Sequence, residues 1–422
     1  MHSASSTLEF ANTVALLERS RDILAGRGPE RRPAGYKQRG KPYWLGIWHE
    51  NLTMIFFVLP DVNRPIGGAK QIYRQVQTLH DAGITAFVLH KRQGFRCTWF
   101  EHRAPVAYLG QSQASYLAEK AYTRIRNRTH FDIAVQRGRE VLIPDGPGDG
   151  DYRRHILGDG DLVVLPEFHG YALNGAVEDL PLAIFNQNPH GTFRGYPTVA
   201  GACPTVYRSR NLTGVVVVSE HSKQYLEFAF PGLPIGHVVN GVDSALFHPN
   251  DTRKPRTLAF MPRKLPSHVE QAINLLRYRG ALRGWSLAPI DGMNETGVAA
   301  MLRQSTVFMS TCTEEGFGLP PLEAAMSGCV VVGYSGRAAD EYMDSRYCEP
   351  VAQHDVLELA SVVEQTMRYC EQHPTAALER AQQFSAQLSE RYSLERERQS
   401  IIAAWSTMLE RASHGSPNPL FP

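Results

Sequence analysis

The chain has 422 residues, of which 43% are hydrophobic and 20% charged, proportions that are typical of a globular protein. That length is enough for two domains, each with its own core. The 44 basic and 42 acidic side chains leave a net charge of +2, which excludes a general electrostatic attraction to nucleic acid or anionic membranes. The six cysteines are scattered and form no C-x-x-C pair, which argues against a structural zinc site and a disulfide framework.

Residues 1–50 precede the first strand signal, and we interpret them as an N-terminal extension. Met1–Phe10 is polar and lacks the apolar stretch of a signal peptide. One helix is predicted over Leu8–Leu24, and the basic excess over residues 19–41, interrupted by Pro and Gly, indicates a solvated surface segment rather than a nucleic-acid arm. The apolar runs of the sequence are far shorter than the roughly 20 residues that cross a bilayer. We therefore expect a cytoplasmic protein, with peripheral membrane contact left open.

Strand and helix patterns alternate along the first half of the chain. Gly67 and Gly68 follow the first strand and precede a helix with one apolar face, which is expected to end at Gly83. The strands are apolar along their whole length, which is typical of a parallel sheet covered by helices. They are predicted at Met54–Leu59, Ile84–Leu89, Leu162–Leu165, Leu182–Phe185 and Val215–Val218.

A second series of the same kind begins near residue 250. Ser267 and Glu270 match a capping box, in which Ser caps a helix and Glu follows three residues later, and Gly280 is expected to end that helix. Another helix is expected around Val298–Leu302, and residues 354–411 look wholly helical. The strands are predicted at Thr257–Met261, Ser286–Ile290, Thr306–Ser310 and Cys329–Val332.

Two such series predict an α/β fold with two Rossmann-like, doubly wound domains that face each other across a cleft. We place the N-terminal domain at residues 51–245 and the C-terminal domain at 246–395. A C-terminal helix and tail, 396–422, is expected to return to the N-terminal domain. A dinucleotide cofactor is disfavoured because no G-x-G-x-x-G motif lies in a strand-to-helix turn and no Walker motif occurs.

The segment Thr311–Glu323 follows a predicted strand directly and carries the strongest functional signal. Gly316 and Gly318 permit backbone angles that other residues avoid, and they let a ligand approach the main chain. The two prolines that follow suit a helix start, so a helix is predicted from about Pro321 to Gly328. A strand, a glycine-rich loop and a helix N-terminus form a site for a diphosphate, because exposed N–H groups and the helix dipole attract an anion.

Two carboxylates lie at the ends of this loop. Glu315 can accept hydrogen bonds from sugar hydroxyls, and Glu323, which is expected in the first helical turn, can bind the vicinal diol of a ribose. The competing interpretation is that Glu323 merely caps the helix and that Glu315 faces solvent. The Gly-Phe-Gly-Leu-Pro-Pro sequence between them favours the functional interpretation.

With these residues the chain resembles the family-four retaining glycosyltransferases of the GT-B fold (glycosyl transferases group 1), whose hallmark is this E-G-F-G-L-P-x-x-E segment, the Glu–x7–Glu motif. Val215–Phe247 is similar to the last N-domain strand and the interdomain crossover of the family. Phe260–Lys264 falls where the family opens its C-terminal domain with a basic strand end. Ile66–Ala69 sits where the glycine loop of the family meets the donor phosphates or the acceptor.

The resemblance implies a role for each matching residue. Glu315 would bind donor-sugar hydroxyls, beside the backbone of Phe317, Gly318 and Leu319. Glu323 would hold the nucleotide ribose, completing the donor-binding side of the motif.

Two cations and two glycines complete the implied donor site. Arg263 and Lys264 would neutralise the charge that builds on the leaving diphosphate, where one such contact lowers the barrier by about 2–4 kcal/mol. Arg263, Lys264 and Glu315 are therefore the expected catalytic residues. Gly67 and Gly68 are expected to contact the donor.

The chain departs from the family pattern at the second cation. The family places its Lys five residues after the Arg, and His268 occupies that position here. Lys264 can substitute, although adjacent residues on a strand point to opposite faces, so that one of Arg263 and Lys264 could point elsewhere. A plain surface charge is the competing interpretation of Lys264.

Three further residues are candidates for sugar or acceptor contacts. His169 and Asn188 follow predicted strands, at the carboxyl ends where open α/β sheets bind ligands. Glu341 matches a position near the donor in the family. The competing interpretations are simple loop hydrogen bonds for His169 and Asn188, and a helix first-turn carboxylate for Glu341.

The expected reaction is transfer of a sugar from a nucleotide-diphosphate donor by retaining, metal-independent front-face displacement, to which the protein contributes positioning and electrostatics. Neither a cofactor nor a metal is expected. The alternatives are a sugar-nucleotide-binding protein without turnover and a transferase that acts on a macromolecule, either DNA or protein. The sequence leaves open the donor base (UDP, GDP or dTDP), the sugar, the oligomeric state and whether the acceptor is a glycan, a lipid-linked sugar, a small molecule or a macromolecule.

Overall fold

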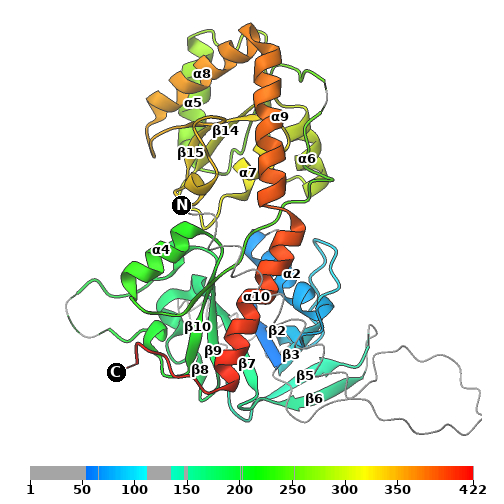
Figure 1. Cartoon of the computed structure of the whole chain (residues 1–422), viewed down its shortest axis with the longest axis vertical. Coiled ribbons are helices and arrows are strands. Elements are labelled where there is room, and N and C mark those ends of the chain that lie inside the picture. Colours follow the sequence, from blue (N-terminus) through cyan, green and yellow to red (C-terminus); the bar gives the residue numbers. More distant parts are fainter. Residues whose placement is uncertain are drawn as a thin grey trace, which may run out of the picture. The chain divides into compact units, whose positions relative to one another are not determined.

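The computed structural model describes residues 54–421, except residues 65, 112–134, 147–150, 200, 202 and 251. The predicted extension 1–50, its helix Leu8–Leu24 and the basic segment 19–41 lie outside the described residues. The described chain forms two lobes, each with its own mainly parallel sheet (Figure 1).

The sheet of the N-terminal lobe has the strand order β11-β10-β9-β7-β1-β2-β3-β5-β6. Neighbouring strands are parallel, except that β5 pairs antiparallel with both β3 and β6. The strands β1, β7, β9 and β10 are buried along their whole length, as their uninterrupted apolar sequences predict. The strands of this sheet are β1 (Met54–Val58), β2 (Ala86–Arg92), β3 (Val106–Gln111), β5 (Glu140–Pro144), β6 (Tyr152–Ile156), β7 (Asp161–Pro166), β9 (Leu182–Asn186), β10 (Leu212–Val217) and β11 (Ile235–His237).

The helices of this lobe follow the carboxyl ends of the strands. α2 (Gly67–Asp81) buries the predicted apolar face, and Gly83, with a φ of 83°, follows its end as expected. α4 (Glu220–Ala229) follows β10. The shorter elements are the 3-10 helices η1 (Glu167–Leu173), η2 (Pro189–Gly191) and η3 (Val206–Arg208), and a separate two-stranded pair of β4 (Val135–Gln136) with β8 (Val177–Glu178).

The C-terminal lobe is built on a parallel sheet with the order β13-β12-β14-β15-β16. The predicted α/β fold with parallel sheets is therefore confirmed. The strands are β12 (Thr257–Phe260), β13 (Ser286–Pro289), β14 (Val307–Cys312), β15 (Val330–Ser335) and β16 (Glu349–Pro350). The helices are α5 (Pro266–Tyr278), α6 (Glu295–Arg303), α7 (Leu319–Met326), α8 (Val356–Gln372) and α9 (Pro374–Arg391), with the 3-10 helix η4 (Ala338–Glu341) after β15.

The last helix, α10 (Leu394–Ser413), packs on the first lobe, where it contacts α2, β10 and β11 (Figure 1). Trp405 of α10 is fully buried, and its ring packs edge-on against Phe57 at a centroid distance of 4.7 Å. Its indole N–H donates to Gln75 Oε1 over 2.9 Å. The C-terminal segment thus ties the end of the chain to the core of the first lobe.

One prediction about the helices needs correction. The capping box at Ser267 is wrong, because α5 already begins at Pro266, with Leu265 as its N-cap and no side-chain cap. Proline suits the first helical position, since its missing N–H has no partner there, and this places Ser267 inside the first turn. The prediction that residues 354–411 are helical is confirmed apart from short breaks before Pro374 and at Tyr392, which divide this segment into α8, α9 and α10.

Candidate functional site

The glycine-rich loop connects β14 to α7, as predicted, but the helix begins earlier than expected. Gly318, with a φ of 86°, is the N-cap of α7, and Leu319 is the first helical residue. The predicted start at Pro321 is therefore wrong by two residues, because prolines, which lack an N–H, fit anywhere in the first turn. Glu323 consequently lies in the second turn and not in the first, and it cannot cap the helix.

Gly316 lies directly against the end of β9 in the other lobe. A Cβ on Gly316 would lie 1.6 Å from the backbone oxygen of Gln187, so that only glycine fits this contact. Asn188 Nδ2 donates to the backbone oxygen of Glu314 over 2.9 Å, and Ser222 Oγ donates to the backbone oxygen of Gly316 over 3.5 Å. Asn188 thus holds the loop through this hydrogen bond, and its contact with a sugar or an acceptor stays a prediction.

The side chain of Phe317 packs into the interior of the C-terminal lobe. Phe317 is buried and packs against the rings of Tyr342 and Tyr392 at centroid distances of 5.7 and 5.6 Å. The hydroxyl of Tyr342 donates to the backbone oxygen of Gly318. These contacts fix the loop from the interior of the lobe, which leaves the backbone of the loop as the part that can meet a ligand.

Lys264 and Glu315 form an ion pair between Nζ and Oε1. Both residues belong to the carboxyl edge of the second sheet, because β12 and β14 are neighbours in it. Arg263 is exposed, and its guanidinium lies 3.7 Å from Met261 Sδ. The strand β12 ends at Phe260, so Arg263 and Lys264 lie in a turn, where the alternation of a strand does not apply.

Glu323 has an unusual electrostatic environment. Burial, and next the negative charge of Glu295, raise the pKa of Glu323 to about 7. The positive charges of Lys70, Arg263 and Arg74 act in the opposite direction. Glu323 therefore lies within reach of cations from both lobes, and perturbed carboxyl groups of this kind are concentrated at functional sites.

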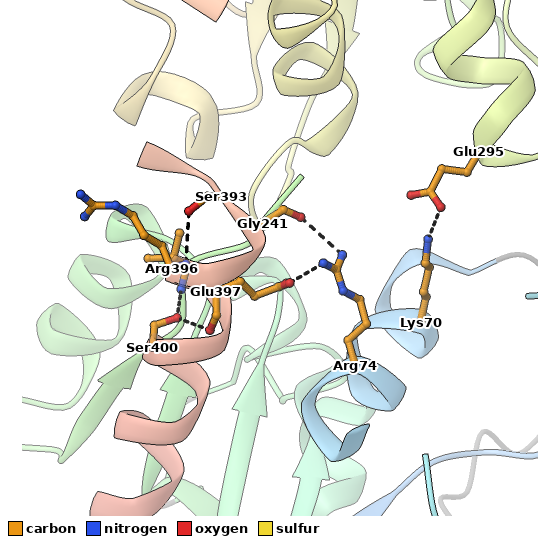
Figure 2. A network of polar contacts seen from close by, with 9 residues as sticks. Lys70, Arg74, Gly241, Glu295, Ser393, Arg396, Glu397 and Ser400 are labelled. Carbon is orange, nitrogen blue, oxygen red and sulfur yellow. Dashed lines mark hydrogen bonds and ion pairs between the residues drawn. The ribbon is translucent and has the colours of Figure 1, made fainter. Parts of the chain in front are cut away.

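The sequence interpretation missed the basic face of α2. Figure 2 shows the side chains of Lys70 and Arg74, one turn apart on α2, directed toward carboxylates of α6 and α10. Lys70 Nζ lies 2.7 Å from Glu295 Oε2, and Arg74 pairs with the buried Glu397. The sequence does place a Lys and an Arg four residues apart after a Gly-Gly pair, which puts both on one face of a helix. It could not indicate their partners, which lie 225 and 323 residues away in the chain.

Gly67 and Gly68 form the first turn of α2, whose N-cap has no side-chain hydrogen bond. The backbone oxygen of Gly68 accepts a hydrogen bond from Gln187 Nε2 over 3.2 Å. Since Gln187 also abuts Gly316, the two glycine segments that the sequence singled out converge on one residue at the end of β9.

His169 and Glu167 lie in η1, directly after β7, at the predicted strand end. Burial, and next the charge of Arg194, lower the pKa of His169 to about 4. Burial raises the pKa of Glu167 to about 7, and its Oε2 has no hydrogen-bond partner among the described residues. Both groups therefore favour their neutral forms. Contact of His169 with a ligand stays a prediction.

Glu341 and His268 have partners within the protein. Glu341 Oε2 accepts from the backbone N–H of Glu220 over 2.9 Å at the start of α4, and its Oε1 accepts from Tyr392 over 3.1 Å. His268 Nδ1 lies 2.9 Å from the hydroxyl of Tyr334. A donor contact by Glu341 stays a prediction.

The described residues bear on two questions, whether the protein has metal-binding groups and whether it has membrane-spanning helices. They contain no group of three or more His, Cys, Asp or Glu side chains that could hold a metal ion. Within that same part of the chain, no helix has the length and apolar character that crossing a membrane requires.

Comparison with known sequences finds similarity to a glucosyltransferase over part of the chain. The chain is 27% identical over 184 residues to an α-1,6-glucosyltransferase of Actinobacillus pleuropneumoniae serotype 7 (strain AP76). The match includes 42% of this chain and 53% of the relative, so that it spans about half the length of that protein. No known family model matches the chain.

Solved glycosyltransferase structures share the fold over most of the chain. A TarM variant of S. aureus, in complex with fondaparinux, α-GlcNAc-glycerol and UDP, is 12% identical with a TM-score of 0.54 and matches 85% of this chain and 99% of its own. The pneumococcal O-GlcNAc transferase GtfA, in complex with UDP and GlcNAc, is 13% identical with a TM-score of 0.51. The match covers 87% of this chain and 100% of GtfA. Anabaena HepE, in complex with UDP and glucose, is 14% identical with a TM-score of 0.52. The match covers 84% of this chain and 100% of HepE. The chain therefore has the GT-B fold of these glycosyltransferases, with sequence similarity to a glucosyltransferase over part of its length.

Proposed function

We propose that this chain is a retaining glycosyltransferase of the family-four type, which transfers a sugar from a nucleotide-diphosphate donor. The observation that carries the proposal is the arrangement around the N-terminus of α7, where the loop backbone adjoins the Lys264–Glu315 pair and Glu323 follows in the second turn. Such a helix end attracts phosphate through its dipole and through the N–H groups of Gly318 and Leu319, since Pro320 and Pro321 have no N–H. The GT-B fold and the partial similarity to a glucosyltransferase support the same activity.

Each group has a separate task in this proposal. The N-terminus of α7, with Arg263 and Lys264, binds the diphosphate, and Gly67 and Gly68 approach it from the first lobe. Residues 246–395 form the donor side and residues 51–245 the acceptor side. Glu323 accepts hydrogen bonds from the ribose diol, and its ionised form can accept from both hydroxyls at once.

The sugar then reacts on the face from which the diphosphate leaves. The bond between the anomeric carbon and the phosphate oxygen breaks, and the acceptor oxygen forms the new bond on the same face. The departing phosphate oxygen takes the proton of the acceptor hydroxyl. Arg263 and Lys264 stabilise the charge on the leaving diphosphate, and Glu315 orients the sugar through its hydroxyls.

UDP-glucose is the first donor to test. UDP is bound in the TarM, GtfA and HepE structures, and the relative is named an α-1,6-glucosyltransferase. A thermal-shift series of UDP, GDP, dTDP and their sugars identifies the base, since a ligand at 100 times its Kd stabilises the protein by about 2.7 kcal/mol. A series in which none of these ligands stabilises the chain would refute the proposed donor class.

Turnover is tested with Glu315→Ala and its neighbour Glu314→Ala as the matched control. We expect the first variant to lose donor hydrolysis and transfer, and the second to keep both, because Glu314 is exposed and forms no ion pair among the described residues. Retention follows from the anomeric configuration of the first product in NMR, and metal independence from unchanged rates in EDTA. Donor binding without turnover in the parent chain would favour a binding protein instead.

A further inference from the structure

Lys264 and Glu315, which the proposed function assigns to different parts of the donor, are bound to each other in this structure. Their side chains are 29% and 19% exposed, so the ion pair is largely shielded from water. Shielding makes it costly to separate such a pair unless each charge finds another partner. Any donor that uses both residues must therefore supply both new partners.

The backbones of the two residues are held in place independently of the pair. The backbone N–H of Glu315 donates to the carbonyl of Gly336 over 3.4 Å, and a Cβ on Gly336 would lie 3.0 Å from Glu315 Cβ. The hydroxyl of Thr311 donates to the backbone carbonyl of Lys264. An exchange of partners therefore requires only rotation of two flexible side chains, not movement of the loop or the turn.

Donor and product differ in what they offer these two charges. A diphosphate competes with Glu315 for Lys264, and it leaves the carboxylate without a partner. The hydroxyls of an attached sugar can donate to that carboxylate, whereas a free nucleoside diphosphate has no group in that place. The intact nucleotide sugar thus compensates both charges, and the product after transfer compensates only Lys264.

We propose that the Lys264–Glu315 pair is a partner-exchange element that discriminates the intact nucleotide sugar from the free nucleoside diphosphate. Binding of the donor opens the pair, so that Lys264 binds the diphosphate and Glu315 binds the sugar. After transfer, Glu315 recaptures Lys264 and weakens the hold on the remaining nucleoside diphosphate, which promotes product release. This inference rests on the proposed function.

The test is UDP binding to the full chain, measured by calorimetry with Glu315→Gln. We expect this variant to bind UDP about threefold or more tightly than the parent, which corresponds to about 0.7 kcal/mol or more, because Lys264 no longer has to leave a carboxylate. Glu314→Gln removes the same charge from the same loop and should leave UDP affinity unchanged. In a Lys264→Met background, Glu315→Gln should no longer tighten UDP.

Lys264→Met provides a second measurement that does not depend on the folding of Glu315→Gln. Without Lys264, the carboxylate has no partner in the empty protein, so the gain from the attached sugar grows, and the ratio of the UDP Kd to the UDP-glucose Kd should rise above that of the parent. Three results would each overturn the partner exchange alone. UDP binding by Glu315→Gln could be unchanged or weaker, Glu314→Gln could have an equal effect, or the tightening could persist in the Lys264→Met background. Absence of binding by the parent to UDP, GDP, dTDP and their sugars would overturn the proposed function with it.

Discussion

Glu323→Gln should separate the stability of the empty protein from its affinity for the donor. The pKa of Glu323 is raised from 4.5 to about 7 by burial and by the charge of Glu295. Because the folded-state pKa lies above that of the unfolded chain, the protonated carboxyl stabilises the fold below pH 4.5, and this stabilisation is lost as the pH rises through 7. At about 1.36 kcal/mol per pKa unit, the loss between pH 4.5 and pH 8 is about 3 kcal/mol.

The assay is urea-induced unfolding of the parent and of Glu323→Gln at pH 4.5 and at pH 8. Glutamine has nearly the same shape as a protonated glutamate and does not ionise, so the two proteins should have similar free energies of unfolding at pH 4.5. At pH 8 the variant should be more stable by about 3 kcal/mol. Other titrating groups, including Glu167 and Glu397, occur in both proteins and cancel in this difference.

At pH 8 the same variant should bind UDP-glucose at least about tenfold more weakly, since a hydrogen bond to a charged group contributes about 1.5–3 kcal/mol. Glu314→Gln, in an exposed position of the same loop, is the control and should change neither quantity. A difference in stability that is the same at both pH values would refute the reasoning about Glu323. Increased stability together with undiminished affinity would refute its role at the ribose.

Three further predictions concern close contacts within the fold. Arg74→Met removes the partner of the buried Glu397 and should cost about 3 kcal/mol of stability in urea unfolding, most of which Glu397→Gln should restore in the double variant; an additive double variant would contradict this pairing. Gly316→Ala drives a Cβ into the carbonyl of Gln187, and it should lower the melting temperature and abolish UDP binding. An unchanged melting temperature would show that this clash does not occur. Lys254→Met leaves three backbone carbonyls without the buried ammonium that bonds them at 2.6–3.0 Å, and it should cost about 2–4 kcal/mol without changing UDP affinity, as unfolding and calorimetry will show.

The central strands and the glycine-rich loop could be predicted because their signals are local. An apolar run such as Met54–Val58 is buried on both faces wherever it sits in a parallel sheet, and Gly316 and Gly318 mark an unusual backbone without reference to distant residues. The short strands β3, β5 and β6 carried no comparable run. β3 pairs parallel with β2, and β5 and β6 extend the sheet further through antiparallel pairing that the pattern did not indicate. Helix ends were least predictable, because Pro266 and Gly318 shift a start by one or two residues.

The sequence by itself determined an α/β fold with parallel sheets and the glycine-rich loop between β14 and α7, and it indicated Lys264, Glu315 and Glu323 as candidate donor contacts. Only the tertiary structure decided which partner each charge has. Lys264 pairs with Glu315 over 51 positions, Lys70 reaches Glu295 over 225, and Asn188 is used to hold the loop. Burial and pairing depend on contacts between segments that are distant in the chain. Burial raises the pKa of Glu323, and pairing makes the proposed partner exchange possible, so neither property follows from residue types alone.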